Sequence, residues 1–332
     1  MKLLNLVTLA CIAAASFGLG MLTVTPDAHA SGEVVMTKRG GSVWRVFKPD
    51  GAELSLAGSP CQGLDTAIAH ATSAGFDLRI HGGGLVGSVD PSVIQCDAPL
   101  VFPPMQKLRM RTGAITLNFG SGVTGTAVTF NSCMMCDVEF AGQIVHNGPG
   151  AVLQFRPSSP LPVDPVTAIV DSRFRFGAVV GQGAARGDDG VRFDFDAGGI
   201  DNSTFEFTEV NGSNRWHGIR VPSATSHSFT GNTVTCPHVH SQHSLGVVIG
   251  TAATARIFAN RWSVNINPAS GGHGLQTHGS RDRIELAVHD GEGAVGTGLV
   301  LGPGATDNLV FLLRLAASMP IQDLSGSTNR IH

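Results

Sequence analysis

"GVRF" at 190–193, "GIRV" at 218–221 and "GVVI" at 246–249 are copies of one short motif, a glycine followed by an apolar residue at every second position. The series continues with "GLQT" at 274 and "GLVL" at 298, so the motif recurs at intervals of 28, 28, 28 and 24 residues. Weaker copies precede it as "AVTF" at 127 and "VLQF" at 152. An apolar residue at every second position is typical of a strand with one buried face. Because a unit this short cannot bury its apolar face alone, the repeat predicts a solenoid of stacked units.

A second series of strand-like segments, each introduced by Asn or Asp, runs through the same units. Its copies are "NSTF" at 202, "NTVT" at 232, "NRWS" at 260, "DRIE" at 282 and "NLVF" at 308. Short strands with almost no helix predict a parallel β-helix whose coils pair at about 4.8 Å. The asparagines Asn202, Asn232 and Asn260 then stand at equivalent turns and should form a side-chain ladder. The residues expected to stack as inward columns are Val191, Phe193, Ile219, Val221, Val247, Ile249, Leu275, Leu299 and Leu301.

The amino-terminal thirty residues have the pattern of an export signal. Lys2 precedes an apolar stretch from Leu3 to Leu22, and "DAHA" at 27–30 supplies the small residues that a signal peptidase prefers. A membrane anchor is the alternative, because the apolar stretch is long enough to span a bilayer. Removing residues 1–30 leaves one domain, 31–332, with recognisable coils at about 78–315. We therefore expect a secreted or periplasmic protein without stable membrane insertion.

Composition excludes some partners and favours disulfides. The net charge is −3, no lysine follows Lys107 and no basic run could track a phosphate backbone, so nucleic acid is not an expected partner. In an exported protein, Cys61 and Cys96, which flank a helical segment at 63–75, form the first pairing to expect. Cys133 and Cys136 suit either a structural role or a redox or metal pair.

The repeat resembles that of the right-handed parallel β-helix proteins of the pectin-lyase-like superfamily. The resemblance covers most of residues 55–315, including "DTAIAHATSAGFDLRIHGG" at 65–83, which looks like the short helix and first strand that close one end of many members. It implies an all-β, right-handed parallel β-helix with a short N-terminal capping helix. Members include lyases, hydrolases, epimerases, phage adhesins and non-catalytic surface proteins, so activity has to be argued from individual residues.

"GDDGVRF", followed one coil later by "HGIRV", resembles part of the polygalacturonase-type hydrolase pattern, an Asp-Asp pair followed by Gly-His-Gly. The resemblance implies that one of Asp188 and Asp189 is the general acid, that the other is the base, and that His217 and Arg220 bind the sugar. "GGHGLQTHGS" at 271–280 resembles the second motif more closely, but it stands several coils downstream. The pattern's aspartate in the preceding coil and its Arg-x-Lys are absent.

Spacing predicts which of these residues meet. Asp189 and His217 each precede a repeat glycine, so we expect them side by side, about 5 Å apart, on the solvent side. Trp216 offers a flat apolar surface for a sugar ring, and arginines offer forked donors to carboxylate or sulfate groups. The expected catalytic residues are Asp188, Asp189 and His217. The expected substrate-binding residues are Arg192, Asp194, Arg215, Trp216, Arg220, His273, Gln276 and His278.

These residues predict an exported enzyme that cleaves glycosidic bonds in an anionic or neutral polysaccharide, with hydrolysis favoured. The first alternative is a lyase acting by β-elimination on a uronate, in which Arg192, Arg220 or Arg215 neutralises the substrate carboxylate and the base is either His217 or an arginine. The second is a non-catalytic carbohydrate-binding or surface scaffold, favoured by the two missing elements of the hydrolase pattern.

No cofactor is required by these hypotheses, although Asp188, Asp189 and Asp194 are the local supply of oxygen ligands for calcium. "CPHVHSQH" at 236–243 would place Cys236, His238 and His240 on one side of a strand, which resembles a soft-metal ligand set. No second coil clearly contributes a ligand, so we expect no tight metal site there.

Overall fold

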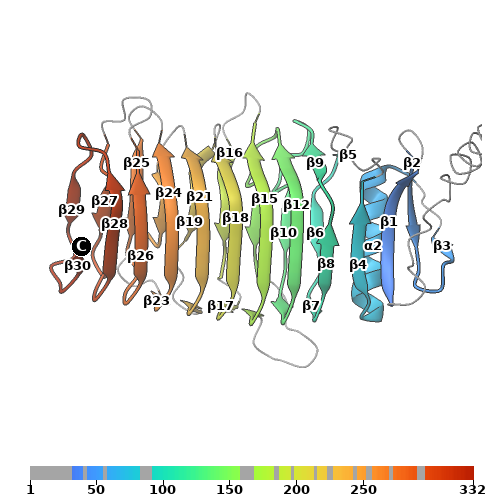
Figure 1. The fold of residues 1–332 in the computed structure, drawn as a ribbon, viewed down its shortest axis with the longest axis horizontal. Coiled ribbons are helices and arrows are strands. Elements are labelled where there is room, and N and C mark those ends of the chain that lie inside the picture. The colour runs from blue at the N-terminus through green and yellow to red at the C-terminus, as the bar shows by residue number, and fades with distance from the viewer. Residues whose placement is uncertain are drawn as a thin grey trace, which may run out of the picture.

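The computed structural model describes residues 32–39, 43–54, 58–82, 92–157, 168–182, 187–195, 198–212, 215–222, 227–241, 245–251, 256–268, 272–289 and 296–332. The expected export signal at 1–30 lies outside these residues. Within them, helix α2 (Pro60–Ala74) and the strands β1 to β30 build a parallel β-helix, as the repeat predicted. Figure 1 shows the coils side by side along the long axis, with α2 at the N-terminal end. No described helix combines the length and apolar character needed to cross a bilayer.

The largest sheet, sheet A, has 15 strands and runs the length of the solenoid. Its long strands bend part-way, at a register break that lies between Phe140 and Gln143 in β12. Its strands are β1 (Glu33–Arg39), β2 (Val43–Phe47), β3 (Glu53–Leu54), β4 (Asp77–His81), β5 (Ser92–Cys96), β8 (Arg109–Thr112), β9 (Ile115–Phe119), β12 (Asp137–His146), β15 (Arg173–Gly181), β18 (Thr204–Gly212), β21 (Thr233–Ser241), β24 (Arg261–Pro268), β26 (Arg283–Val288), β28 (Leu309–Leu315) and β30 (Arg330–Ile331).

Sheet B has 9 strands and carries the glycine repeat. Its strands are β6 (Leu100–Phe102), β10 (Val128–Phe130), β13 (Leu153–Phe155), β16 (Gly187–Phe193), β19 (Arg215–Val221), β22 (Leu245–Ile249), β25 (His273–Thr277), β27 (Leu299–Leu301) and β29 (Ile321–Asp323). Sheet C has 6 strands, namely β7 (Met105–Gln106), β11 (Cys133–Met134), β14 (Ala168–Val170), β17 (Gly199–Asp201), β20 (Phe229–Thr230) and β23 (Ile257–Phe258). Each coil therefore contributes one strand to several sheets around a common interior.

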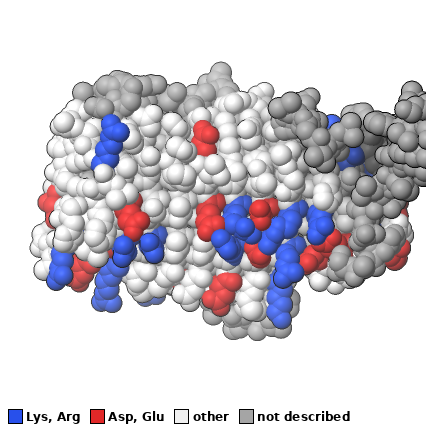
Figure 2. All heavy atoms as spheres, viewed as in Figure 1, with Lys and Arg blue, Asp and Glu red and all other residues white. Residues whose placement is uncertain are grey.

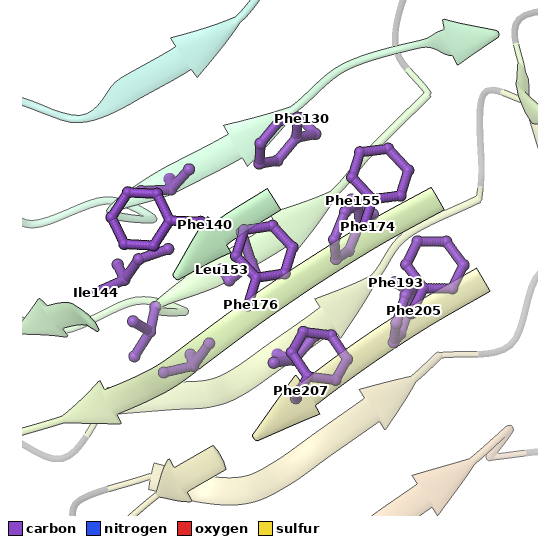
Figure 3. Close-up of a cluster of buried hydrophobic side chains, with 14 of the residues drawn as sticks. Phe130, Phe140, Ile144, Leu153, Phe155, Phe174, Phe176, Phe193, Phe205 and Phe207 are labelled. Atoms are coloured by element: carbon purple, nitrogen blue, oxygen red, sulfur yellow. The ribbon is translucent and has the colours of Figure 1, made fainter. Parts of the chain in front are cut away.

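The interior is filled by the predicted columns. Val191, Ile219 and Val247 are register partners on successive strands, and each is fully buried. In the N-terminal half the columns are aromatic: the ring of Phe155 stacks on Phe130 at 5.7 Å and on Phe193 at 5.1 Å between centroids (Figure 3). Like side chains in register pack against one another from coil to coil, since every coil offers the next the same shape.

The repeat glycines occur where sheet B presses against sheet A. A Cβ on Gly218 would lie 2.4 Å from Cγ1 of Val239, a fully buried side chain of β21. The same step one coil earlier would put a Cβ on Gly190 2.7 Å from Cγ1 of Val210. No real Cβ tolerates such distances, so glycine occupies this position in the coils from Gly190 onwards because the two sheets approach closely there.

A polar ladder lines the turns that lead from sheet C into sheet A. Asn232 accepts a hydrogen bond from the backbone N–H of Ser203 (3.0 Å), and Asn260 accepts one from Asn232 (3.0 Å). We call this the turn ladder, and its members are Ser172, Ser203, Asn232, Asn260, Asp282, Asn308 and Asn329.

The predicted place of Asn202 in this ladder is wrong. Asn202 is exposed and adopts a left-handed backbone (φ 49°), and its neighbour Ser203 takes the ladder position. Asparagine suits both positions, because it tolerates left-handed geometry and also accepts backbone hydrogen bonds. Sequence alignment on asparagine was therefore one residue out of register in this coil.

The N-terminal end is closed by α2 and secured by a disulfide. Ser59 caps the helix and forms a capping box with Gln62, and Gly75 ends it in a left-handed conformation. The predicted Cys61–Cys96 disulfide is confirmed, with an S–S distance of 2.02 Å. Cys133 and Cys136 also form a disulfide.

Candidate functional site

The Asp189–His217 pair lies on β16 and β19 of sheet B. The two residues are direct register partners, and Nδ1 of His217 lies 2.7 Å from Oδ1 of Asp189. The prediction that the 28-residue spacing brings them side by side is confirmed. A carboxylate at this distance accepts the Nδ1 proton, which fixes the imidazole tautomer and leaves Nε2 to exchange a proton with a ligand.

The prediction that both side chains lie on the solvent side is wrong for Asp189. Asp189 is 0% exposed, whereas the His217 side chain retains 18% exposure. Strand β16 already begins at Gly187, so the alternation that turns Val191 inward also turns Asp189 inward. By the same alternation Asp188 points outward, and it is exposed.

Two arginines follow the pair in the outward row of sheet B. Arg192 and Arg220 are register partners, and each side chain is 29% exposed. Nη1 of Arg220 lies 3.9 Å from Oδ2 of Asp189. Arg192 donates from Nε to Oδ1 of Asp194 (2.9 Å). The two guanidinium groups therefore stand side by side in adjacent coils, each near a carboxylate.

Asp194 is held within this cluster by hydrogen bonds and is largely shielded from solvent. It is 7% exposed and also accepts a hydrogen bond from Nε2 of Gln154, at 2.5 Å. Burial opposes the charge on Arg192, but Asp194, with help from Asp189 and Asp188, raises the pKa of that guanidinium above its ordinary value. Gln154 was not among the residues predicted from the sequence, although the "VLQF" copy of the repeat aligns it with Arg192.

Unsatisfied polar atoms mark the centre of the cluster. Among the described residues, Oδ2 of Asp189 and Nε of Arg220 are buried without a hydrogen-bond partner. Buried polar atoms are nearly always satisfied in folded proteins, so an exception calls for water or a ligand. We refer to Asp189, His217, Arg220, Arg192 and Asp194 as the sheet B cluster.

Trp216 lies beside this cluster and Arg215 beneath it. Trp216 is 42% exposed on the outward side of β19, where the sequence predicted a stacking surface. Arg215 is fully buried and donates to the carbonyl oxygens of Gly148 and His146, each at 2.9 Å, so the prediction that it binds substrate is contradicted. Burial lowers the pKa of this guanidinium, and the charges of Asp188 and Asp189 oppose that shift. Alternation counted back from His217 accounts for the inward direction of Arg215.

The residues predicted further along the groove are held by local contacts. His273 is in the same column as His217, two strands on, and its Nδ1 accepts the backbone N–H of Thr297 at 2.9 Å. His278 is only 8% exposed, with Nδ1 2.9 Å from the Pro303 carbonyl oxygen and Nε2 3.0 Å from Nε2 of Gln276. The structure thus separates His273, Gln276 and His278 from the sheet B cluster.

The expected grouping of Cys236, His238 and His240 is wrong. Cys236 is fully buried and its thiol donates to the His238 carbonyl oxygen (3.3 Å), while the His238 side chain is exposed. A register break between Cys236 and Val239 disturbs the alternation on which the grouping rested. Burial raises the pKa of the Cys236 thiol to about 12, which disfavours the thiolate that a soft metal binds.

The described residues contain no group of three or more His, Cys, Asp or Glu side chains that could hold a metal ion. Of the three aspartates suggested for calcium, Asp189 and Asp194 are buried against His217 and Arg192, and Asp188 alone is exposed. What the cluster offers chemically is an imidazole oriented by a buried carboxylate and two cationic groups for an anion.

Comparison with protein-family models, with curated proteins and with solved structures finds no match for this chain. The chemistry of the sheet B cluster therefore has to be argued from its own geometry.

Proposed function

We propose that the protein is a polysaccharide-cleaving enzyme whose site is the sheet B cluster, with His217 as the group that moves a proton. The observation that supports this most is the 2.7 Å contact between Nδ1 of His217 and a fully buried carboxylate. A buried carboxylate orients an imidazole and fixes its tautomer, the arrangement required of a general base. Neighbouring unsatisfied atoms on Asp189 and Arg220 are consistent with a ligand-binding position.

The substrate we propose is a polymer that carries carboxylate groups. Arg220 and Arg192 offer positive charge on adjacent coils, and Trp216 offers an exposed apolar surface one residue from His217. Adjacent coils repeat at about 4.8 Å, comparable with the length of one sugar residue, so a polymer aligned with the solenoid axis meets a new strand at each residue. Trp216 would stack on a sugar ring.

The burial of Asp189 favours β-elimination over hydrolysis as the reaction. A two-carboxylate hydrolysis requires both aspartates to face the substrate, and Asp189 is 0% exposed. In an elimination on a uronate, an arginine neutralises the substrate carboxylate and His217 removes the proton from the adjacent carbon. The C–H and C–O bonds break, a C=C bond forms, and the departing oxygen takes a proton from water.

The test is to incubate the purified protein with uronate-containing and neutral polysaccharides and to follow both reducing ends and ultraviolet absorbance. Elimination gives new reducing ends together with an absorbing unsaturated product. Reducing ends without absorbance would support the hydrolase and contradict His217 as an elimination base. Binding without cleavage would indicate a carbohydrate-binding scaffold and refute the enzyme proposal.

A further inference from the structure

The two arginines of the sheet B cluster are equally exposed but are held differently. Arg192 and Arg220 are register partners on β16 and β19. Nε of Arg192 donates to Oδ1 of Asp194 at 2.9 Å. Nη1 of Arg220 lies 3.9 Å from Oδ2 of Asp189, too far for a hydrogen bond, and its Nε is buried without a partner among the described residues. Of the two, Arg192 is therefore the one whose guanidinium is fixed by a hydrogen bond within the described part of the chain.

Asp194 is itself held from the preceding coil. Its second oxygen, Oδ2, accepts a hydrogen bond from Nε2 of Gln154 at 2.5 Å, and both side chains are buried. Gln154 lies on β13, in register with Arg192. The backbone N–H of Asp194 also donates to the carbonyl oxygen of Phe155, the residue after Gln154, at 2.9 Å. The Asp194 carboxylate thus links the Gln154 amide in one coil to the Arg192 guanidinium in the next.

The contact with Asp194 uses one edge of the Arg192 guanidinium and leaves its end open. An arginine has five N–H donors in one plane, and Nε carries one of them. Among the residues that the structure describes, Nε is the only guanidinium atom of Arg192 with a hydrogen-bond partner. Nη1 and Nη2 carry the other four donors, and the side chain is 29% exposed. Two parallel N–H groups at this end match the two oxygens of a carboxylate.

Restricting this side chain strengthens its binding of a ligand. A flexible arginine loses rotamer freedom when it binds, and that loss weakens the complex. A guanidinium that a neighbouring carboxylate already restricts has less freedom to lose. Gln154 restricts Asp194 in turn, so the two residues would act on a ligand through Arg192 and not by touching it.

We propose that Gln154 and Asp194 are positioning residues, which hold Arg192 so that its Nη1 and Nη2 bind the carboxylate of one sugar residue. The inference rests on the proposed function, because it gives the carboxylate-binding role to one of the two arginines of that site. Arg220, which lacks such support, is not the main carboxylate ligand. The substrate class is a polyuronate with free carboxylates. A methyl ester of the same polymer is a poor ligand, since it offers Arg192 no charge.

The experiment measures the preference of the protein for a free acid over its methyl ester. Oligomers of galacturonate and of guluronate, each in both forms, are titrated into the wild type and Gln154→Leu, and the ratio of the two dissociation constants is compared. The wild type should favour the free acid. Gln154→Leu should reduce that preference by about 10-fold, the usual effect of one hydrogen bond to a charged group. Gln322→Leu makes the same change further along the same row of sheet B, on β29, and should keep the wild-type ratio.

A double mutant tests whether Gln154 acts through Arg192. Arg192→Gln removes the guanidinium and should reduce the preference for the free acid at least as much as Gln154→Leu does. Adding Gln154→Leu to Arg192→Gln should then cause no further loss, because no guanidinium remains to be positioned. A full additional loss in the double mutant would overturn the proposal, and so would an unchanged preference in Gln154→Leu.

The outcomes separate this inference from the proposed function. A wild type that favours the free acid without cleaving it, and loses that preference in Gln154→Leu, would refute the enzyme proposal and support this one. A wild type that binds acid and ester equally would overturn the inference even if it cleaves the polymer. If the variants fail to fold, nuclear magnetic resonance of the wild type decides. On adding the free-acid oligomers, the Nη resonances of Arg192 should shift more than its Nε resonance, and unchanged Nη resonances would contradict the proposal.

Discussion

Charged residues gather on two faces of the solenoid, and their side chains are exposed to different extents on the two faces. On sheet A a band of alternating basic and acidic side chains crosses the strands near the middle of the molecule (Figure 2). Arg111 pairs with Asp137 and Glu139, and Arg175 pairs with the same two carboxylates from the next coil. These side chains are 31–38% exposed, so the pairs keep part of their hydration, and each contributes little to stability.

The sheet B cluster holds its charges inside the wall instead. Asp189 is fully buried, whereas the sheet A carboxylates Asp137 and Glu139 are 38% and 36% exposed. Unpartnered polar atoms do not distinguish the faces, since among the described residues each of the two groups has two. A buried charge with incomplete partners is costly, and replacing such a group by well-packed apolar side chains is often neutral or stabilising. The full burial of Asp189 is consistent with the chemical role proposed above for the sheet B cluster, whereas the sheet A band is a more solvated charge surface.

The largest effect should come from His217→Gln. If the sheet B cluster catalyses cleavage, loss of the base should lower kcat by about 10²- to 10⁴-fold, while an amide leaves the fold intact. The measurement is the initial rate on the best polysaccharide found in the substrate panel. Arg111→Gln on sheet A is the control and should keep the wild-type rate. Equal rates for both variants would remove the functional distinction between the faces.

The second effect concerns stability. Asp189→Ala removes the buried carboxylate that pairs with His217 and Arg220 and leaves the Nδ1–H of His217 without its acceptor, so we expect a loss of about 3 kcal/mol in the free energy of unfolding. Urea denaturation measures it, provided the slope of the transition is unchanged. A loss below about 1 kcal/mol would show that the buried pair behaves like a surface pair.

The third effect is the small one expected from sheet A. Arg173 donates to both carboxylate oxygens of Glu206, at 3.1 and 3.0 Å, and the two side chains are 53% and 37% exposed. A double-mutant cycle with Arg173→Gln and Glu206→Gln should give a coupling of about 0.2–1 kcal/mol that diminishes with added salt. A coupling that salt leaves unchanged would contradict the view of sheet A as a solvated charge surface.

The smallest effect is a response to acid. Burial alone would raise the pKa of Asp137, but the hydrogen bond and charge of Arg111, together with the charge of Arg175, outweigh it and lower that pKa below its ordinary value. A lowered pKa means that the ionised form stabilises the fold above 3.8 and that this contribution disappears as the pH falls through the lower folded value. The wild type should therefore exceed Asp137→Asn in Tm near neutral pH and lose that advantage in acid. If the advantage in Tm of the wild type over Asp137→Asn grew in acid, the predicted direction of the pH dependence would be wrong.

The sequence predicted the coils well because the same physical constraint acts in each of them. Glycine recurs at Gly190 and Gly218 wherever a Cβ would strike sheet A, and the 28-residue spacing that results also brings Asp189 to His217. The predictions that were wrong concerned contacts that the spacing of residues along the chain does not reveal. The partners of Arg215 are carbonyl groups 67 and 69 residues away, and asparagine chemistry does not distinguish Asn202 from its neighbour in the ladder.

The turn ladder also has a mechanical consequence. Each rung is bonded mainly to the rung before and the rung after it, so a force applied along the axis would load one intercoil seam at a time. The protein would then unfold stepwise under tension and release a similar length of chain with each event, rather than unfolding all at once.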